Sequence, residues 1–101
     1  MSYTYRLHPL ISQDYNDAYQ WYEEKQKGLG ERFLKAVRSK IEEIVLNPQA
    51  FGSKGNKKFR EAAVDYFPFL IVYKINKRKS ELYISSIHHT QKHPRKKYRK
   101  E

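Results

Sequence analysis

Arg60, His88 and His89 are the residues whose types best suit acid–base chemistry on a phosphate group. Metal-independent RNA cleavage needs a base for the ribose 2′-hydroxyl, an acid for the leaving oxygen and fixed cations for the phosphate charge. Histidine can serve as base or acid near neutrality, because its reference pKa is about 6.5. Lys92 and Tyr98 follow the histidines in the chain. The hypothesis requires these groups to converge on one face of a sheet, although strand alternation aims His88 and His89 at opposite faces.

Structural roles for the same residues stay open. Either histidine can end a strand with its ring half buried, because histidine is intermediate in burial. Arg60 can be a surface charge or an ion-pair partner of Glu61 or Asp65. Four aromatic residues at helical spacing are more typical of a core than of a stacking platform for bases. They are Tyr15, Tyr19, Trp21 and Tyr22.

The excess of positive over negative charge lies entirely in the second half of the chain. Residues 1–50 carry seven basic and seven acidic side chains, whereas residues 51–101 carry fourteen basic and four acidic ones. This distribution favours a phosphate-rich or acidic partner, and the alternative is a solubilising surface with a disordered basic end. The basic residues that we expect to hold an RNA backbone are Lys54, Lys57, Lys58, Lys92 and Arg95.

Several classes of site are missing from the sequence. The 101 residues include no cysteine, and the four histidines form no H-E-x-x-H pattern, so we expect no metal site. No glycine-rich phosphate loop or hydrolase motif occurs, and we expect no cofactor. No apolar run approaches the roughly 18 residues of a membrane span, so the prediction is a cytoplasmic protein. The length fits one domain over residues 1–101.

The predicted elements follow the order β-α-α-β-β-β. Residues 3–7 alternate as a strand, and a helix begins near Pro9 and ends near Gly28. Leu29 and Gly30 form a short connection to a second helix, which Asn47 and Pro48 end. The two helices are expected to be antiparallel.

The second half is predicted to form the sheet. Residues 51–58 read as a loop, and residues 59–63, 67–75 and 82–88 as strands, with 67–75 central. Residues 90–101 have almost no apolar content and are predicted to be a mobile basic tail. The fold class is therefore α+β, a helical hairpin packed on an antiparallel sheet.

Four segments in this order resemble one protein family. They are WYEEKQKGLGERF (residues 21–33), Asn47-Pro48, FREAAVDYFPFLIVYKI (residues 59–75) and IHHTQKHP (residues 87–94). Together they are similar to the RelE/ParE superfamily of toxins from type II toxin-antitoxin systems, and closer to its ParE-like, plasmid-stabilisation branch. The resemblance implies the helical-hairpin-on-sheet fold and a cognate antitoxin, whose acidic or amphipathic segment wraps the toxin.

The resemblance implies two different activities, because the family carries both on one fold. RelE-like members cut mRNA on the ribosome, and Arg60 and His88 or His89 match their catalytic region. ParE-like members inhibit DNA gyrase, and no catalytic residue is carried over from them. This sequence departs from the ribonuclease pattern, because no acidic residue clearly takes the general-base position of some subtypes.

Three hypotheses follow. The working one is a toxin that cleaves mRNA, with Arg60 stabilising phosphate charge and His89 or His88 as acid or base. The second is a ParE-like gyrase inhibitor without catalysis. The third is a degenerate member that only binds nucleic acid or a partner.

Overall fold

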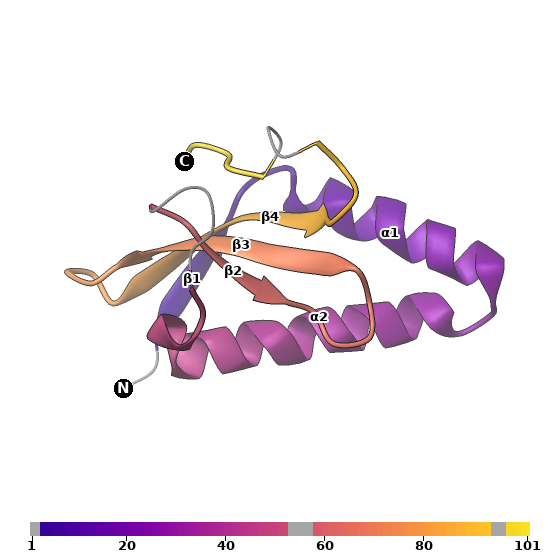
Figure 1. Cartoon of the computed structure of the whole chain (residues 1–101), viewed down its shortest axis with the longest axis horizontal. Helices are drawn as coiled ribbons and strands as arrows, with labels where there is room; N and C mark the ends of the chain where they lie inside the picture. Colours follow the sequence, from indigo (N-terminus) through magenta and orange to yellow (C-terminus); the bar gives the residue numbers. More distant parts are fainter. Residues whose placement is uncertain (1–2, 53–57, 94–96) are drawn as a thin grey trace.

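The computed structural model describes residues 3–52, 58–93 and 97–101, and shows two helices on one face of a four-stranded sheet (Figure 1). The chain order confirms the predicted succession and the α+β class. The elements are β1 (Thr4–Leu7), α1 (Ile11–Lys25), α2 (Leu29–Leu46), the short 3-10 helix η1 (Pro48–Ala50), β2 (Arg60–Ala63), β3 (Phe69–Asn76) and β4 (Glu81–His89).

Apolar residues at helical spacing turn one side of α2 towards the sheet. Phe33, Val37, Ile41 and Ile44 are all buried and follow one another at intervals of four, four and three residues. This spacing keeps their side chains on one stripe of the helix. Burying that stripe, more than helix propensity, stabilises a helix of this length.

The turn between the helices depends on Glu23. Its carboxylate accepts hydrogen bonds from the backbone N–H groups of Gly28 and Gly30, each at 3.0 Å. Gly28 has a φ of 89°, which suits glycine. The predicted connection at Leu29 and Gly30 is wrong, because both residues already belong to α2. Glu23 satisfies N–H groups that a helix start leaves without partners.

The sheet has the strand order β1-β4-β3-β2, so β3 is central as predicted. β2, β3 and β4 pair antiparallel, but β1 pairs parallel to β4, from Thr4 opposite Glu81 to Leu7 opposite Ile84. The prediction of a wholly antiparallel sheet is therefore wrong for β1. Side-chain alternation within a four-residue strand is the same in either direction and cannot distinguish them.

The core lies between the helices and the sheet. Four aromatic rings meet there, with the Phe33 and Phe69 centroids 4.9 Å apart and Tyr22 and Phe67 beside them. The expectation that the α1 aromatics form core is right for Tyr22. It is wrong for Trp21, which is 55% exposed because the adjacent position turns it off the apolar stripe.

Residues 97–101 cross the other face of the sheet, which the helices leave uncovered (Figure 1). The Tyr83 hydroxyl donates to the Lys100 carbonyl at 2.9 Å, and the Lys74 ammonium lies 3.0 Å from the Glu101 carboxylate. The composition of residues 90–101 predicted a mobile tail, whereas these contacts hold residues 97–101 against the sheet. No helix in the described ranges has the length and apolar character needed to cross a membrane.

Candidate functional site

A cavity of about 580 Å³ lies between α1 and the end of β4. The described residues that line it come from α1, the start of β3, the end of β4 and the segment after it. They include Asp14, Asp17, Trp21, Tyr22, Phe69, Ile87, His88, His89, Lys92 and Arg99. The structure therefore brings together three predicted site residues, His88, His89 and Lys92.

Trp21 gives the cavity an exposed aromatic edge. Its ring meets that of Tyr22 edge-on, with centroids 5.1 Å apart, and the Lys25 ammonium lies 4.8 Å from the Trp21 centroid. Buried Tyr22 holds the tryptophan on one side, while more than half of the tryptophan surface stays exposed. Exposed tryptophan beside a cavity is typical of surfaces that bind another protein.

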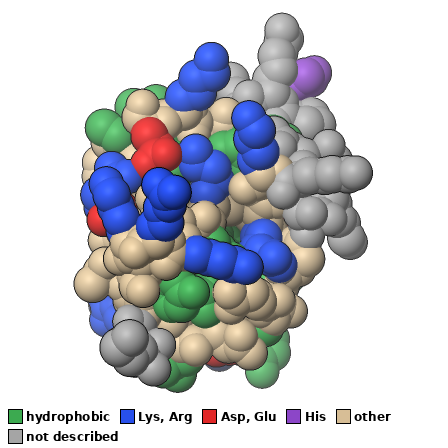
Figure 2. Space-filling model, turned by 90° about the vertical axis from the view of Figure 1, so that its left-hand side faces the viewer, with side chains coloured by type: hydrophobic (Ala, Val, Ile, Leu, Met, Phe, Trp, Pro, Cys, Tyr) green, Lys and Arg blue, Asp and Glu red, His purple; other side chains and the backbone are tan. Residues whose placement is uncertain are grey.

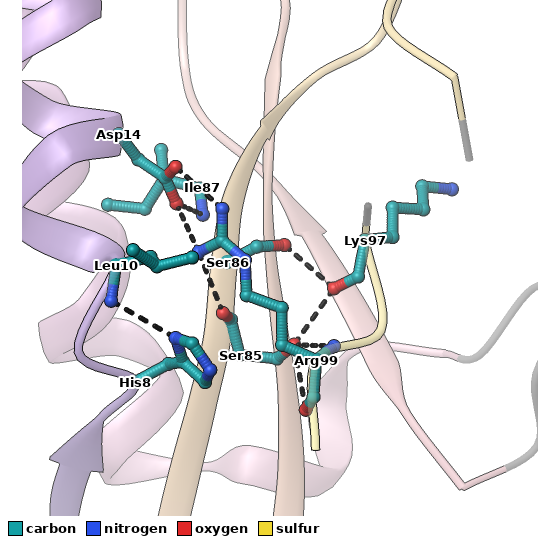
Figure 3. A network of polar contacts seen from close by, with 8 residues as sticks. All are labelled: His8, Leu10, Asp14, Ser85, Ser86, Ile87, Lys97 and Arg99. Atoms are coloured by element: carbon teal, nitrogen blue, oxygen red, sulfur yellow. Dashed lines mark hydrogen bonds and ion pairs between the residues drawn. The ribbon is translucent and has the colours of Figure 1, made fainter. Parts of the chain in front are cut away.

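Asp14 and Arg99 join α1 to residues 97–101, which we call the C-terminal segment, beside this cavity (Figure 3). Two parallel bonds of 2.9 Å connect the guanidinium to the two carboxylate oxygens. The backbone N–H of Ile87 donates to the same carboxylate at 3.1 Å. Bidentate pairs of this kind are directional and comparatively strong. Asp14 thus fixes α1, β4 and the C-terminal segment to one another.

Two serines of β4 hold the same segment. The hydroxyls of Ser85 and Ser86 each donate to the Lys97 carbonyl at 2.8 Å, and the Arg99 N–H donates to the Ser85 hydroxyl at 2.6 Å (Figure 3). Both serines are available because the β3–β4 register shifts between Val72 and Tyr73. Ser85 is the extra residue of this bulge.

His88 is buried, at 5% exposure, and faces the C-terminal segment. Its Nε2 lies 3.2 Å from the Lys92 carbonyl, an acceptor, so this nitrogen carries the proton. Burial lowers the pKa of the ring, and this outweighs the hydrogen bond to the Lys92 carbonyl and the Glu61 carboxylate, which act in the opposite direction. A neutral, buried ring with a backbone partner fits the structural role left open for this histidine.

His89 lies on the opposite side of β4, at the edge of the core. Its ring meets Phe69 edge-on at a centroid distance of 5.0 Å. Its Nδ1 accepts the Gln91 backbone N–H at 3.0 Å, which places the proton of the neutral ring on Nε2. Of the two histidines, His89 is the more exposed, and no described residue is a partner of its Nε2.

Arg60 lies far from both histidines. Arg60 on β2 is paired with Tyr73 on β3, so both side chains lie on the helix-covered face. Tyr73 is four residues along β3 from Phe69, which is paired with His89 on β4. Four strand residues span about 13 Å. The Arg60 guanidinium donates to the Phe51 carbonyl at 2.6 Å and lies 3.5 Å from that of Gln49. The structure therefore separates Arg60 from the histidines.

The segment that Arg60 holds is also held by Tyr73. The buried Tyr73 hydroxyl donates to the Pro48 carbonyl at 2.6 Å, and burial raises the pKa of this tyrosine to about 12. Asp65, an alternative partner for Arg60, instead lies 3.4 Å from the ammonium of Lys40. Arg60 and Tyr73 together bind the carbonyls around η1 to the sheet.

Glu61, which the sequence analysis considered only as a partner of Arg60, makes a polar cluster with Lys97 and Tyr98. One carboxylate oxygen lies 3.1 Å from the Lys97 ammonium and accepts the Tyr98 hydroxyl at 2.7 Å. The Glu61 side chain is only 6% exposed, and burial followed by this carboxylate raises the Tyr98 pKa to about 12. Strand alternation alone predicts that Glu61 lies on the other face of the sheet from Arg60. Its partners could not be predicted in this way, because they are about 36 residues away in the chain.

Of the predicted RNA-binding residues, the two that the structure describes, Lys58 and Lys92, lie apart. Lys92 lines the cavity near α1, and Lys58 lies beside the far end of β3. Lys54, Lys57 and Arg95 lie outside the described residues. Within the described ranges, no three histidine or acidic side chains come together as a possible metal site.

A family model describes most of this chain. The model of the ParE toxin of the type II toxin-antitoxin system, parDE, matches residues 5–94. No curated protein sequence matches.

Solved structures show the same fold at low sequence identity. The chromosomal ParDE toxin-antitoxin system of P. aeruginosa superposes with a TM-score of 0.67 at 19% identity, covering 89% of this chain and 98% of that one. An arginine-to-alanine double mutant of the E. coli toxin RelE in the free state gives 0.67 at 14% identity, covering 90% and 86%. The isolated E. coli RelE toxin gives 0.66 at 13%, covering 91% and 88%.

The match over residues 5–94 agrees with the helical hairpin, the sheet and the cavity described above. The chain belongs to the ParE toxin family of type II toxin-antitoxin systems, within the RelE/ParE superfamily.

Proposed function

We propose that this toxin inhibits DNA gyrase by binding, in the manner of the ParE-like branch, and cuts no RNA. The observation that carries the proposal is the position of Arg60. Its guanidinium donates a hydrogen bond to the Phe51 carbonyl. Along the strand direction, Arg60 lies about 13 Å from the level of His89, and it lies on the opposite face of the sheet from His88. Phosphodiester cleavage needs its cation and its acid–base groups around one phosphate.

The cavity beside Trp21 supports an activity based on protein binding. It offers apolar walls, an exposed tryptophan and polar groups at Asp17 and Lys92. Interfaces typically gain most of their binding energy from a few buried aromatic residues within a polar rim. Trp21 is therefore the residue of this surface whose loss should weaken partner binding most.

Membership of the family implies an antitoxin partner. Because the net positive charge lies in residues 51–101, we expect an antitoxin with an acidic segment to associate quickly and with marked salt dependence. This expectation holds whether the toxin acts on gyrase or on RNA.

One observation favours mRNA cleavage on the ribosome as a second candidate function. His88, His89 and Lys92 line a single cavity, and within the described ranges the His89 Nε2 has no partner. In that case His89 would act as acid or base beside Lys92, and Arg60 would serve the fold. The ribosome and mRNA would then replace gyrase as partners.

The two functions can be separated in the same cells. The toxin is expressed in a bacterial host while its antitoxin is repressed, and plasmid supercoiling and new mRNA 5′ ends are measured within minutes. We expect supercoiling to be blocked while mRNA stays intact. Cuts inside translated frames, with normal supercoiling, would replace the gyrase proposal by the ribonuclease one.

His89→Gln gives the sharpest variant for this experiment. Glutamine keeps a polar side chain at the cavity but cannot act as an acid or base near pH 7. We expect full toxicity from a variant that melts at the temperature of the parent protein. Arg60→Ala is the matched structural control, and it should lower the melting temperature because the Phe51 carbonyl loses its partner.

A further inference from the structure

The turn between β3 and β4 presents a dense group of cations that the sequence analysis did not assign to any site. Lys77, Arg78 and Lys79 are consecutive and exposed. The turn is held by the Asn76 side chain, which accepts the Lys79 N–H at 3.2 Å, and by the Ser80 N–H, which donates to the Lys77 carbonyl at 3.3 Å. The three cations are therefore displayed from a turn of defined geometry.

Further cations extend this group over the end of the sheet. A hollow of about 550 Å³ is lined there by basic side chains from β1, β3 and the turn, and by Lys58, two residues before β2. We call the group the hairpin surface, and it consists of Arg6, Lys58, Lys74, Lys77, Arg78 and Lys79. Figure 2 shows lysine and arginine side chains gathered over this end of the molecule, with few acidic side chains among them.

Two of the described residues that line this hollow are acidic, and both are paired. Glu81 lies 3.1 Å from the Arg6 guanidinium, and Glu101 contacts both Arg6 and Lys74. The two carboxylates are thus balanced by two of the six cations. The turn cations add positive charge beyond these pairs, and that charge favours an anionic ligand.

Among the described residues that line the hollow, the apolar side chains are turned inward and offer no exposed anchor for a protein partner: Ile75 is half-buried and packs against the core. The aromatic residue among them, Tyr83, is only 5% exposed and lies beneath the Arg6 and Lys74 cations, 5.7 and 5.5 Å from the ring centroid. Protein interfaces combine buried apolar anchors with a polar rim. Binding to a nucleic acid backbone needs only an array of cations that release counterions from the phosphates.

We propose that the hairpin surface binds the sugar-phosphate backbone of duplex DNA without reading its sequence. The choice of DNA rests on the proposed function, because gyrase acts on duplex DNA. The hairpin surface and the cavity beside Trp21 lie at opposite ends of the β3–β4 pair. The hairpin surface lies at the end where Asn76 is paired with Glu81, and the cavity at the end where Phe69 is paired with His89. Seven strand residues span about 23 Å, so a protein target and DNA can be held together.

The test measures DNA binding directly, without gyrase. The anisotropy of a labelled 20-base-pair duplex of mixed sequence is followed as toxin is added, between 50 and 200 mM salt. The variant replaces Lys77, Arg78 and Lys79 by glutamine. The matched control replaces Lys27, Arg32 and Lys35, three exposed cations of the helical hairpin, and loses the same charge.

We expect the hairpin variant to bind at least about tenfold more weakly at 150 mM salt, and to lower the salt slope by up to about 2.7, or 0.9 for each lost phosphate contact. The helical control should keep the slope of the parent protein. Equal weakening in the two variants would reduce the effect to net charge and overturn the proposal.

Two further arms test the kind of ligand. An acidic peptide of glutamates, or a single-stranded RNA, that binds more tightly than the duplex at the same salt and depends on the same three residues would overturn the assignment to DNA. Because gyrase is absent, failure here leaves the supercoiling result unchanged. Conversely, hairpin-dependent DNA binding by a toxin that does not block supercoiling would uphold this inference and reject the proposed target.

Discussion

One face of the sheet is covered by α1 and α2, and the other by the five residues 97–101. The helix-covered face carries apolar side chains such as Ile71 and Ile84, which pack against two long helices. The opposite face carries Glu61, Ser85 and Ser86, which are held by hydrogen bonds and an ion pair to the C-terminal segment. One layer is stabilised by apolar burial and the other mainly by directional polar contacts.

This difference predicts unequal local stability. Apolar burial is spread over many contacts, so the helical layer should separate from the sheet only when the whole domain unfolds. Residues 97–101 are few and are held to the sheet mainly by polar contacts, so these contacts should open at a lower free energy than that of global unfolding. The sheet face beneath it would then be exposed while the core stays intact.

The largest expected effect comes from removing two methyl groups from each layer. Val37 belongs to α2 and packs into the core between the helices and the sheet, whereas Val72 belongs to β3 and lies between Glu61 and Ser86 on the face that residues 97–101 cross. Both are 0% exposed. Either change to alanine loses about 1.6 kcal/mol of transfer free energy. Val37→Ala should add a cavity term because the helices cannot close the gap, for a total loss of about 2–3 kcal/mol. The measurement is the free energy of unfolding in urea.

Val72→Ala is the matched control for Val37→Ala. The segment of residues 97–101 can settle onto the smaller side chain, so the loss should stay near 1–2 kcal/mol, without the full cavity term. Equal losses at the two positions would mean that the C-terminal segment is as rigid as the helices and would contradict the comparison.

A smaller effect should come from the ion pair of Asp14 and Arg99, which joins α1 to the C-terminal segment. The Asp14 and Arg99 side chains are 15% and 19% exposed, so their bidentate contact is only partly screened by water. Asp14→Asn should lower the free energy of unfolding by about 1–2 kcal/mol. Arg99→Gln, alone and combined with Asp14→Asn, completes a double-mutant cycle in urea, with an expected coupling of about 1 kcal/mol. Additive losses would show that the two side chains contribute independently.

The helix-covered layer could be predicted because its signals are local. Phe33, Val37, Ile41 and Ile44 identify their helix by spacing alone, and the alternation of β3 identifies a buried strand. The start of α2 was missed because Glu23 caps it from the preceding helix, through a side-chain contact across the turn. The direction of β1 was missed because four alternating residues do not encode it.

The polar layer could not be predicted in the same way. The Asp14 carboxylate and the Arg99 guanidinium are 85 residues apart in the chain, and the Glu61 partners lie in a segment whose composition predicted mobility. The catalytic roles of Arg60, His88 and His89 stay predictions. Their separation in space depends on register and on the bulge at Ser85, which residue types do not reveal.

The smallest expected effect concerns the pH dependence of the polar layer. Burial lowers the pKa of His88 below that of an unfolded histidine, near 6.5, so the unfolded chain binds this proton more readily. The contribution of neutral His88 to the free energy of unfolding should therefore be fully present above about pH 6.5. It should fall as the pH drops below this value, by at most about 1.4 kcal/mol per pH unit. Urea unfolding between pH 8 and pH 5 measures this slope.

His88→Gln removes the titrating group while keeping a donor for the Lys92 carbonyl. The other histidines and the carboxylates are the same in both proteins, so the difference between the two curves isolates His88. As the pH falls, the free energy of unfolding of the variant should approach or exceed that of the parent protein, whatever the difference between them at pH 8. Parallel curves would mean that His88 takes up its proton equally well in the folded chain, because the C-terminal segment opens to water without unfolding the core.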